Sequence, residues 1–223
     1  MRKLFIALCF LSVSSVAARA DKPVNWTGFY FGGHGAYLSS DTAYPGSTAP
    51  SQSFDGALLG LQAGYNWQIG NVVLGAEADI SFGNIKDALR DGNFLGYSGK
   101  IDTMGTVRGR LGYSFGNVMP YLTAGYGWVR LEQGSTCPDA APFGVCSFTG
   151  KYDVASKETF SGFVWGGGVE WAIARQWSLK AEMLFMDLDR ESYTATIPNV
   201  GKVTSPVDLN VDYLAKVGVN YRF

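Results

Sequence analysis

In this 223-residue chain, the residues with the greatest potential for chemistry are charged side chains that alternate with apolar residues. Within their segments they share one parity, so a one-residue slip in register would move all of them onto the apolar face. Six are acidic and five are basic: Glu77, Asp79, Asp102, Glu170, Glu182, Asp212, Arg108, Arg110, Lys180, Lys216 and Arg222. Because buried charges persist when they are paired, we predict a structural ion network, for example of Glu77 and Asp79 with Arg108 and Arg110. An ion pathway and catalysis are the alternatives.

His34 is the single histidine, and it could in principle act as a general base, a haem ligand or a pH switch. It lies between glycines on the face that carries the charges. No serine and aspartate accompany it at a spacing that identifies a hydrolytic triad. We therefore expect a hydrogen-bonded interior histidine, no catalytic residue and no enzyme activity.

Cys137 and Cys146 bracket a segment that contains prolines and a glycine. Together with a single histidine they cannot supply the four ligands of an ordinary zinc site, so no metal site is predicted. In an exported chain the two cysteines can pair. We predict a disulfide that stiffens a surface segment, with two free thiols as the alternative.

These residues lie on eight segments that alternate with the two-residue period of a β-strand. The segments span about 27–38, 56–67, 72–82, 101–115, 119–131, 160–173, 177–188 and 213–223. Short connections at 68–71, 116–117 and 174–176 alternate with long stretches near 39–55, 83–100, 132–159 and 189–208, which we predict to be loops. Each segment is long enough for the roughly 9–11 residues that cross an outer membrane as a tilted strand.

The apolar face of these segments favours lipid as its environment. Aromatic residues recur near both strand ends, at Phe29, Trp67, Phe115, Trp171 and Phe223 on one rim and at Tyr37, Phe82, Trp128, Phe163 and Tyr213 on the other. Two such girdles are typical of a membrane barrel, whereas a soluble barrel would reverse the two faces. The fold class predicted is all-β, an eight-stranded antiparallel transmembrane β-barrel of the outer-membrane type. The chain contains 29 glycines, and many of them lie inside the predicted strands. We expect these glycines to relieve crowding in the narrow interior of the barrel.

The first residues have the features of an export signal. Arg2 and Lys3 precede an apolar run, and Ala18-Arg19-Ala20 fits a cleavage site, so we predict a signal peptide over 1–20 and a barrel domain over 21–223. Removing three of 18 basic residues leaves 15 against 19 acidic ones, a net charge of −4. That charge argues against a nucleic-acid partner.

Several short blocks occur along the chain in a characteristic order: Trp26-Thr27-Gly28-Phe29-Tyr30, Gly64-Tyr65-Asn66-Trp67, Gly109-Arg110-Leu111-Gly112-Tyr113, Pro120-Tyr121, Trp177-Ser178-Leu179-Lys180-Ala181-Glu182 and Val219-Asn220-Tyr221-Arg222-Phe223. Together they resemble the alphaproteobacterial outer-membrane immunogenic protein family, whose barrel is similar to the membrane domain of the OmpA class. The resemblance implies a surface antigen of the Gram-negative outer membrane, without a defined catalytic site. Since the chain ends at the barrel, we expect no cell-wall-binding domain.

We expect a non-enzymatic surface protein that supports envelope integrity and presents loops. Its predicted partners are outer-membrane lipid and lipopolysaccharide, the barrel-assembly machinery through a C-terminal signal at Tyr221 and Phe223, and, as a further candidate, a host surface. No cofactor is predicted. The alternatives are a small porin-like channel and a hemin-binding protein, in which hemin stacks on the loop aromatics Tyr44, Phe94, Tyr97 and Phe143.

Overall fold

The computed structural model describes residues 24–43, 52–90, 96–137, 146, 149, 151–197, 199 and 201–223. The predicted signal segment 1–20 lies outside these ranges. The strands are β1 (Gly28–Ala43), β2 (Ser53–Ile69), β3 (Val72–Arg90), β4 (Gly96–Tyr113), β5 (Val118–Cys137), β6 (Tyr152–Ala172), β7 (Trp177–Leu188), β8 (Glu191–Ile197) and β9 (Gly201–Arg222). Among the described residues, no helix is long and apolar enough to cross a membrane.

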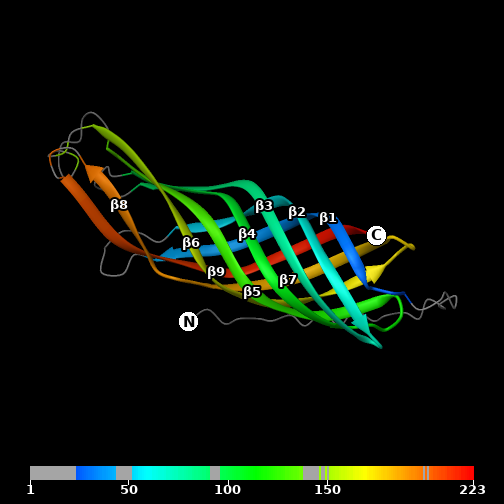
Figure 1. Cartoon of the computed structure of the whole chain (residues 1–223). Helices are drawn as coiled ribbons and strands as arrows, with labels where there is room; N and C mark the ends of the chain where they lie inside the picture. Colours follow the sequence, from blue (N-terminus) through cyan, green and yellow to red (C-terminus); the bar gives the residue numbers. More distant parts are fainter. Residues whose placement is uncertain are drawn as a thin grey trace, which may run out of the picture.

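Eight of these strands close into an antiparallel barrel (Figure 1). Neighbours in sequence pair from β1 to β7, β7 pairs with β9, and β9 returns to β1 in a register that runs from Tyr30↔Arg222 to Ala43↔Asp208. The remaining strand, β8, forms a hairpin with β9 at the end of the barrel opposite the C-terminus. The predicted fold class, an eight-stranded antiparallel barrel, is confirmed.

The strands continue far beyond the segments that alternation predicts. Long loops are predicted near 39–55, 83–100, 132–159 and 189–208, and this prediction is wrong for most of the described residues of these stretches, which belong to strands. β5 and β6 stay paired as far as Cys137 and Tyr152. The strands therefore build a tall extension at the end of the barrel where the long connections lie, which is the extracellular end in outer-membrane barrels.

An inversion of polarity explains why the extension is hard to recognise in the sequence. In the membrane-facing part, apolar residues point outward and charged residues point inward. In the extension, Leu131 and Phe160 are buried inside, whereas Glu132 and Lys157 form an exposed ion pair on the outer face. The pattern in which apolar residues face outward thus ends where the strands leave lipid. The strands themselves continue beyond that point.

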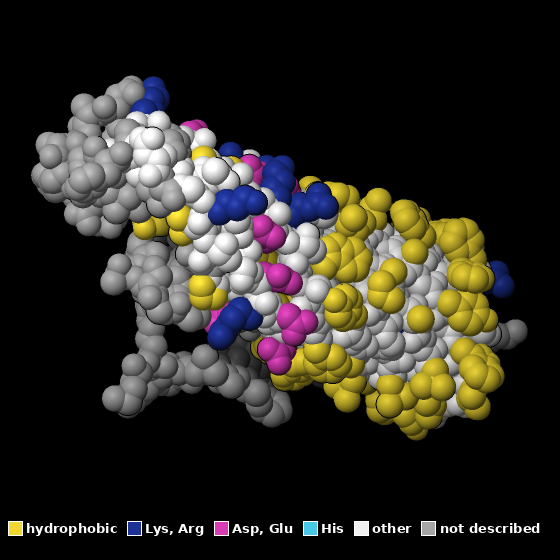
Figure 2. Space-filling view, turned by 60° about the vertical axis from the view of Figure 1, so that its left-hand side comes forward, with side chains coloured by type: hydrophobic (Ala, Val, Ile, Leu, Met, Phe, Trp, Pro, Cys, Tyr) yellow, Lys and Arg dark blue, Asp and Glu magenta, His cyan; other side chains and the backbone are white. Residues whose placement is uncertain are grey.

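The outer surface is divided into two zones (Figure 2). On the face shown, one end carries many exposed apolar side chains, the described surface toward the other end is mostly polar, and charged side chains gather at the border between them. The belt includes Phe29, Trp67, Phe115, Trp171 and Phe223 at the short-turn rim and Tyr37, Phe82, Phe163 and Tyr213 at the other rim, while Trp128 is half-buried. Both predicted aromatic girdles are present.

Three layers of side chains fill the interior. The extension core is an apolar cluster formed by Ala36, Leu38, Phe54, Leu58, Ile85, Ile101, Met104, Val129, Leu131, Phe160, Val164, Leu184, Met186, Val207, Leu209, Val211 and Leu214. A charged layer lies within the apolar belt. The periplasmic cluster, formed by Trp26, Val73, Met119, Tyr121 and Ala172, occupies the end with the short turns. An eight-stranded barrel is narrow enough for side chains to fill it in this way.

Phe160→Ala tests whether the extension is held by its core. Phe160 is 1% exposed, so the substitution leaves a cavity and is expected to destabilise the extension by about 3–5 kcal/mol. Limited proteolysis at Lys157 should become faster. Thr159→Ala, on the exposed face of the same strand, is the control, and equal cleavage rates in the two variants would contradict the assignment.

Candidate functional site

The charged layer contains equal numbers of buried acids and bases. The eight members are Glu77, Asp79, Glu170, Glu182, Arg108, Arg110, Lys180 and Lys216, and each is at most 6% exposed. Five strands, β3, β4, β6, β7 and β9, contribute them. The predicted network is therefore present for these residues, and its formal charge is zero.

Arg108 is the centre of this layer. Its guanidinium contacts Glu77 at 2.7 Å, Asp79 at 2.9 Å and Glu182 at 2.7 Å. The planar fork of arginine has five N–H donors and can serve several carboxylates at once. Arg108 thereby joins β3 and β7 across the lumen from its place on β4.

The two lysines complete the coordination of the β3 carboxylates. Lys180 lies 2.7 Å from Glu77, and Lys216 lies 2.6 Å from Asp79. Thr106 also donates a hydrogen bond to Asp79. Glu77 and Asp79 therefore each face two or more cations, which compensates for the loss of water around them.

Arg110 forms a second branch nearer the short-turn end. It contacts Glu170 at 2.6 Å, and Glu77 at a longer 3.5 Å. Its guanidinium carbon lies 4.2 Å from the centre of the Tyr121 ring, a cation–π distance. Glu170 accepts further hydrogen bonds from Ser178 and Asn220, so the branch ends on neutral donors.

His34 lies inside the barrel in a neutral hydrogen-bond chain. Its Nδ1 is 2.6 Å from Gln62 Oε1, and its Nε2 is 2.8 Å from Ser81 Oγ. Gln62 in turn donates to Asn220 at 2.6 Å. A side chain at Gly60 would place its Cβ 2.4 Å from His34 Nε2, which explains a glycine at this position. The prediction of a hydrogen-bonded interior histidine is confirmed.

Two predicted members of the network, Asp102 and Asp212, are wrong. Asp102 lies at a register shift between Ile101 and Thr103, and Ile101 faces the interior in its place. Asp212 lies at the shift where Ser39 pairs with Tyr213 and Ser40 with Val211, and it is exposed. A β-bulge adds one residue to a strand and changes the parity beyond it. Neither carboxylate forms an ion pair with the eight charges of the layer.

Arg222 is a third correction, because it lies inside the barrel but outside the network. It is 7% exposed, and no carboxylate of the described residues lies within 4.0 Å of its guanidinium. Its guanidinium carbon instead lies 4.6 Å from the centre of the Trp26 ring. The strand alternation placed Arg222 on the correct face, but parity carries no information about depth along the barrel.

Trp26 is a structural residue that alternation does not reveal. It is 1% exposed, its backbone N–H donates to Gln68 Oε1 at 2.8 Å, and its indole N–H donates to Ser114 Oγ at 3.1 Å. The segment before β1 thus folds into the short-turn mouth and places an aromatic ring there. The only sequence signal is its presence in the first block of the family resemblance.

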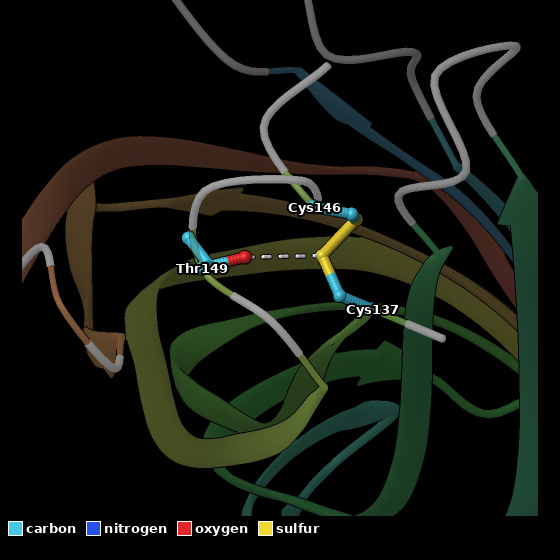
Figure 3. Close-up of a disulfide and its surroundings, with 3 residues drawn as sticks. All are labelled: Cys137, Cys146 and Thr149. Carbon is cyan, nitrogen blue, oxygen red and sulfur yellow. Dashed lines mark hydrogen bonds between the residues drawn. A yellow bond between two sulfur atoms is a disulfide. The ribbon is translucent and has the colours of Figure 1, made fainter. Parts of the chain in front are cut away.

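Cys137 and Cys146 form the predicted disulfide, with Cα atoms 5.4 Å apart (Figure 3). Both are buried, and Thr149 Oγ1 lies 3.6 Å from Cys137 Sγ. Val154 and Ile197 pack against the pair. The bridge therefore ties the end of β5 to the top of the extension, far from the charged layer.

The interior has the composition of a structural plug. The eight charges of its layer are paired and buried, and no cluster of three or more potential metal ligands occurs among the described residues. Of the aromatic residues suggested for hemin, Tyr44, Phe94 and Phe143 lie outside the described residues. Tyr97 is half-buried in β4, opposite Ser135. Nothing in the described interior brings aromatic rings together around an open site for a macrocycle.

Comparison with known proteins identifies the family. The sequence model described as "Outer membrane protein beta-barrel domain" matches residues 5–223. The chain belongs to this family. It is 32% identical to the 31 kDa outer-membrane immunogenic protein of Brucella melitensis biotype 1 over 95% of this chain and 90% of the relative. It is 30% identical to the 22 kDa outer membrane protein of Rhizobium leguminosarum bv. viciae over 76% of this chain and 67% of the relative.

The fold is also that of a solved barrel. OprG from Pseudomonas aeruginosa matches 90% of this chain and 98% of its own with a TM-score of 0.57 and 16% identity, which shows a shared fold alone. The relatives place the chain with the alphaproteobacterial outer-membrane immunogenic proteins, as the resemblance predicts. The protein is accordingly a β-barrel of the Gram-negative outer membrane.

Arg108→Met tests the central role of this arginine. Removing it leaves three buried carboxylates short of one cation, so the variant is expected to be less stable by about 3–5 kcal/mol, and thermal unfolding in detergent should show a lower midpoint. Arg130→Met, at an exposed position on β5, is the control. A midpoint for Arg108→Met equal to that of the control would refute the network.

Proposed function

We propose that this protein is a non-enzymatic structural surface protein, which supports the outer membrane and displays its extension outside the cell. The observation that carries this proposal is the filled interior, in which a neutral charged layer lies between two apolar clusters. The outer surface consists of a broad apolar belt that suits lipid and a polar extension that suits water. Together these features support a membrane-anchored scaffold in preference to a channel or an enzyme.

The bilayer conductance of the refolded protein distinguishes scaffold from channel. We expect no discrete conductance steps, because an ion would have to cross both the extension core and the periplasmic cluster. Insertion is verified in parallel by the difference in gel mobility between unboiled and boiled samples, which closed barrels often show. Ion-dependent steps from verified insertions would overturn the scaffold proposal and make a porin-like channel the leading function.

Lipopolysaccharide is the partner that the outer surface supports best. Lys86 pairs directly with Lys100, Lys100 with Glu132, and Glu132 with Lys157, so one row crosses β3 to β6. Lys86 and Lys157 are exposed, and exposed Arg130 lies beside the row. Like charges opposite one another in a sheet repel, so an anion between Lys86 and Lys100 would stabilise the pair. This row lies just above the outer girdle, where lipid A phosphates lie.

The double variant Lys86→Gln/Lys100→Gln tests this contact. Since each lysine near an anionic lipid surface contributes about 1 kcal/mol, we expect about ten-fold or more loss of lipopolysaccharide affinity. Binding is measured with lipopolysaccharide-containing and phosphatidylcholine nanodiscs. Asp41→Asn/Asp55→Asn, at exposed positions on β1 and β2, is the matched control. Unchanged affinity in the lysine variant would argue against this row as the contact.

Assembly is the second partner relationship in the proposal. Tyr221 and Phe223 belong to an outward aromatic group in which the Trp177–Tyr221 and Tyr221–Phe223 ring centres are 5.1 and 5.2 Å apart. This arrangement supports recognition of the closing strand by the barrel-assembly machinery. Binding of hemin or of a host surface stays a prediction that no described residue supports specifically.

A further inference from the structure

The uncompensated cation Arg222 leads to a site at the periplasmic mouth of the barrel. A cavity of about 350 Å³ lies there, lined by Asn25, Thr27, Arg175, Gln176, Arg222 and Phe223. Its walls come from the segment before β1, the turn between β6 and β7, and the end of β9. It is separated from the charged layer by the periplasmic cluster, so it is a different site.

Arg222 supplies a buried and under-bonded guanidinium to this cavity. The Arg222 guanidinium has five N–H donors. Within the described structure its one hydrogen bond runs from Nη2 to the Arg175 carbonyl, at 3.3 Å. Its Nε is buried without a partner. The Trp26 ring stabilises the flat face of the cation but accepts none of its in-plane hydrogen bonds. Burying a guanidinium costs free energy unless an anion or water accepts its remaining hydrogen bonds.

The turn of Arg175 is held beside Arg222 by the backbone. Arg222 N–H donates to the Gln176 carbonyl at 2.7 Å, in addition to the contact with the Arg175 carbonyl. Arg175 and Arg222 therefore both line the cavity, and among the described residues neither guanidinium has a carboxylate within 4.0 Å. An anion bound there would have two cations beside it.

Two neutral residues of the cavity, Asn25 and Thr27, use their side-chain oxygens as acceptors and keep donors available. Asn25 Oδ1 accepts from the Thr27 N–H at 3.0 Å, and Thr27 Oγ1 accepts from the Gln68 N–H at 3.0 Å. The amide N–H₂ of Asn25 and the hydroxyl hydrogen of Thr27 remain as donors. A cavity lined by two arginines, with further N–H and O–H donors from Asn25 and Thr27, is complementary to an oxyanion.

We propose that this cavity binds a phosphate group at the periplasmic surface of the outer membrane. The phosphate can belong to the headgroup of a glycerophospholipid in the periplasmic leaflet or to a free periplasmic anion. Phe223 favours the lipid, since it lines the cavity and also contacts the lipid-facing Tyr221 at a ring distance of 5.2 Å. A headgroup in the cavity would thus have its acyl chains beside the aromatic rim.

The test uses Arg175→Gln in the whole mature protein, refolded in zwitterionic detergent. This variant removes one guanidinium and leaves the Arg222–Trp26 contact intact, so folding should be unchanged. In the first measurement, the thermal unfolding midpoint is followed as phosphate is added at constant ionic strength. In the second, native mass spectrometry measures how much phosphatidylglycerol the protein retains relative to phosphatidylcholine. Arg130→Gln, an exposed arginine at the other end of the membrane belt, is the control.

We expect Arg175→Gln to weaken anion binding about ten-fold, as the loss of one charge-assisted hydrogen bond implies, while Arg130→Gln leaves it unchanged. Retention of phosphatidylglycerol without a response to phosphate identifies a lipid headgroup as the ligand. A saturable response to phosphate without lipid retention identifies a free anion. If the wild-type protein shows neither, or if Arg175→Gln equals wild type in both measurements, water alone completes Arg222 and the proposal is wrong.

Discussion

The balance of charge around Arg108 is the interaction on which the rest of the barrel depends. A narrow lumen that carries acids on β3, β6 and β7 must hold an equal number of cations within reach, because water is excluded from it. Arg108 meets three carboxylates from two strands, so its position couples the register of β3, β4 and β7. A one-residue slip of any of these strands would remove its charge from the layer and expose it to lipid.

The layers on either side make this network structural in character. The extension core and the periplasmic cluster exclude water from the two ends of the charged layer, which strengthens each ion pair within it. Trp26 has a special part in this arrangement, since it comes from outside the strands and lies between the network and the mouth. The same residue supports Arg222 on its other side, so the apolar closure of the lumen and the proposed phosphate site share one aromatic ring.

The outer surface relates the fold to its surroundings. The belt matches a lipid phase, the row of Lys86, Lys100, Glu132 and Lys157 lies just above its outer rim, and the cavity with Arg175 and Arg222 lies at the opposite end of the barrel. In the arrangement proposed above, the barrel would contact both leaflets through cations, while the charged layer inside it has a formal charge of zero. Display of the extension then requires only that the membrane-spanning part stay rigid, which a filled lumen provides.

The sequence by itself determined the fold class, the faces of the strands and most of the charged layer, because the two-residue period of a strand is visible wherever one face meets lipid. It also identified the cysteine pair from their number and spacing. Tertiary structure alone decided the positions of Asp102 and Asp212, since a bulge shifts parity by one residue and leaves no local signature. It also decided the height of the strands above the membrane, where polarity inverts. The isolation of Arg222 depends on depth along the barrel axis, which only the closure of β9 onto β1 establishes.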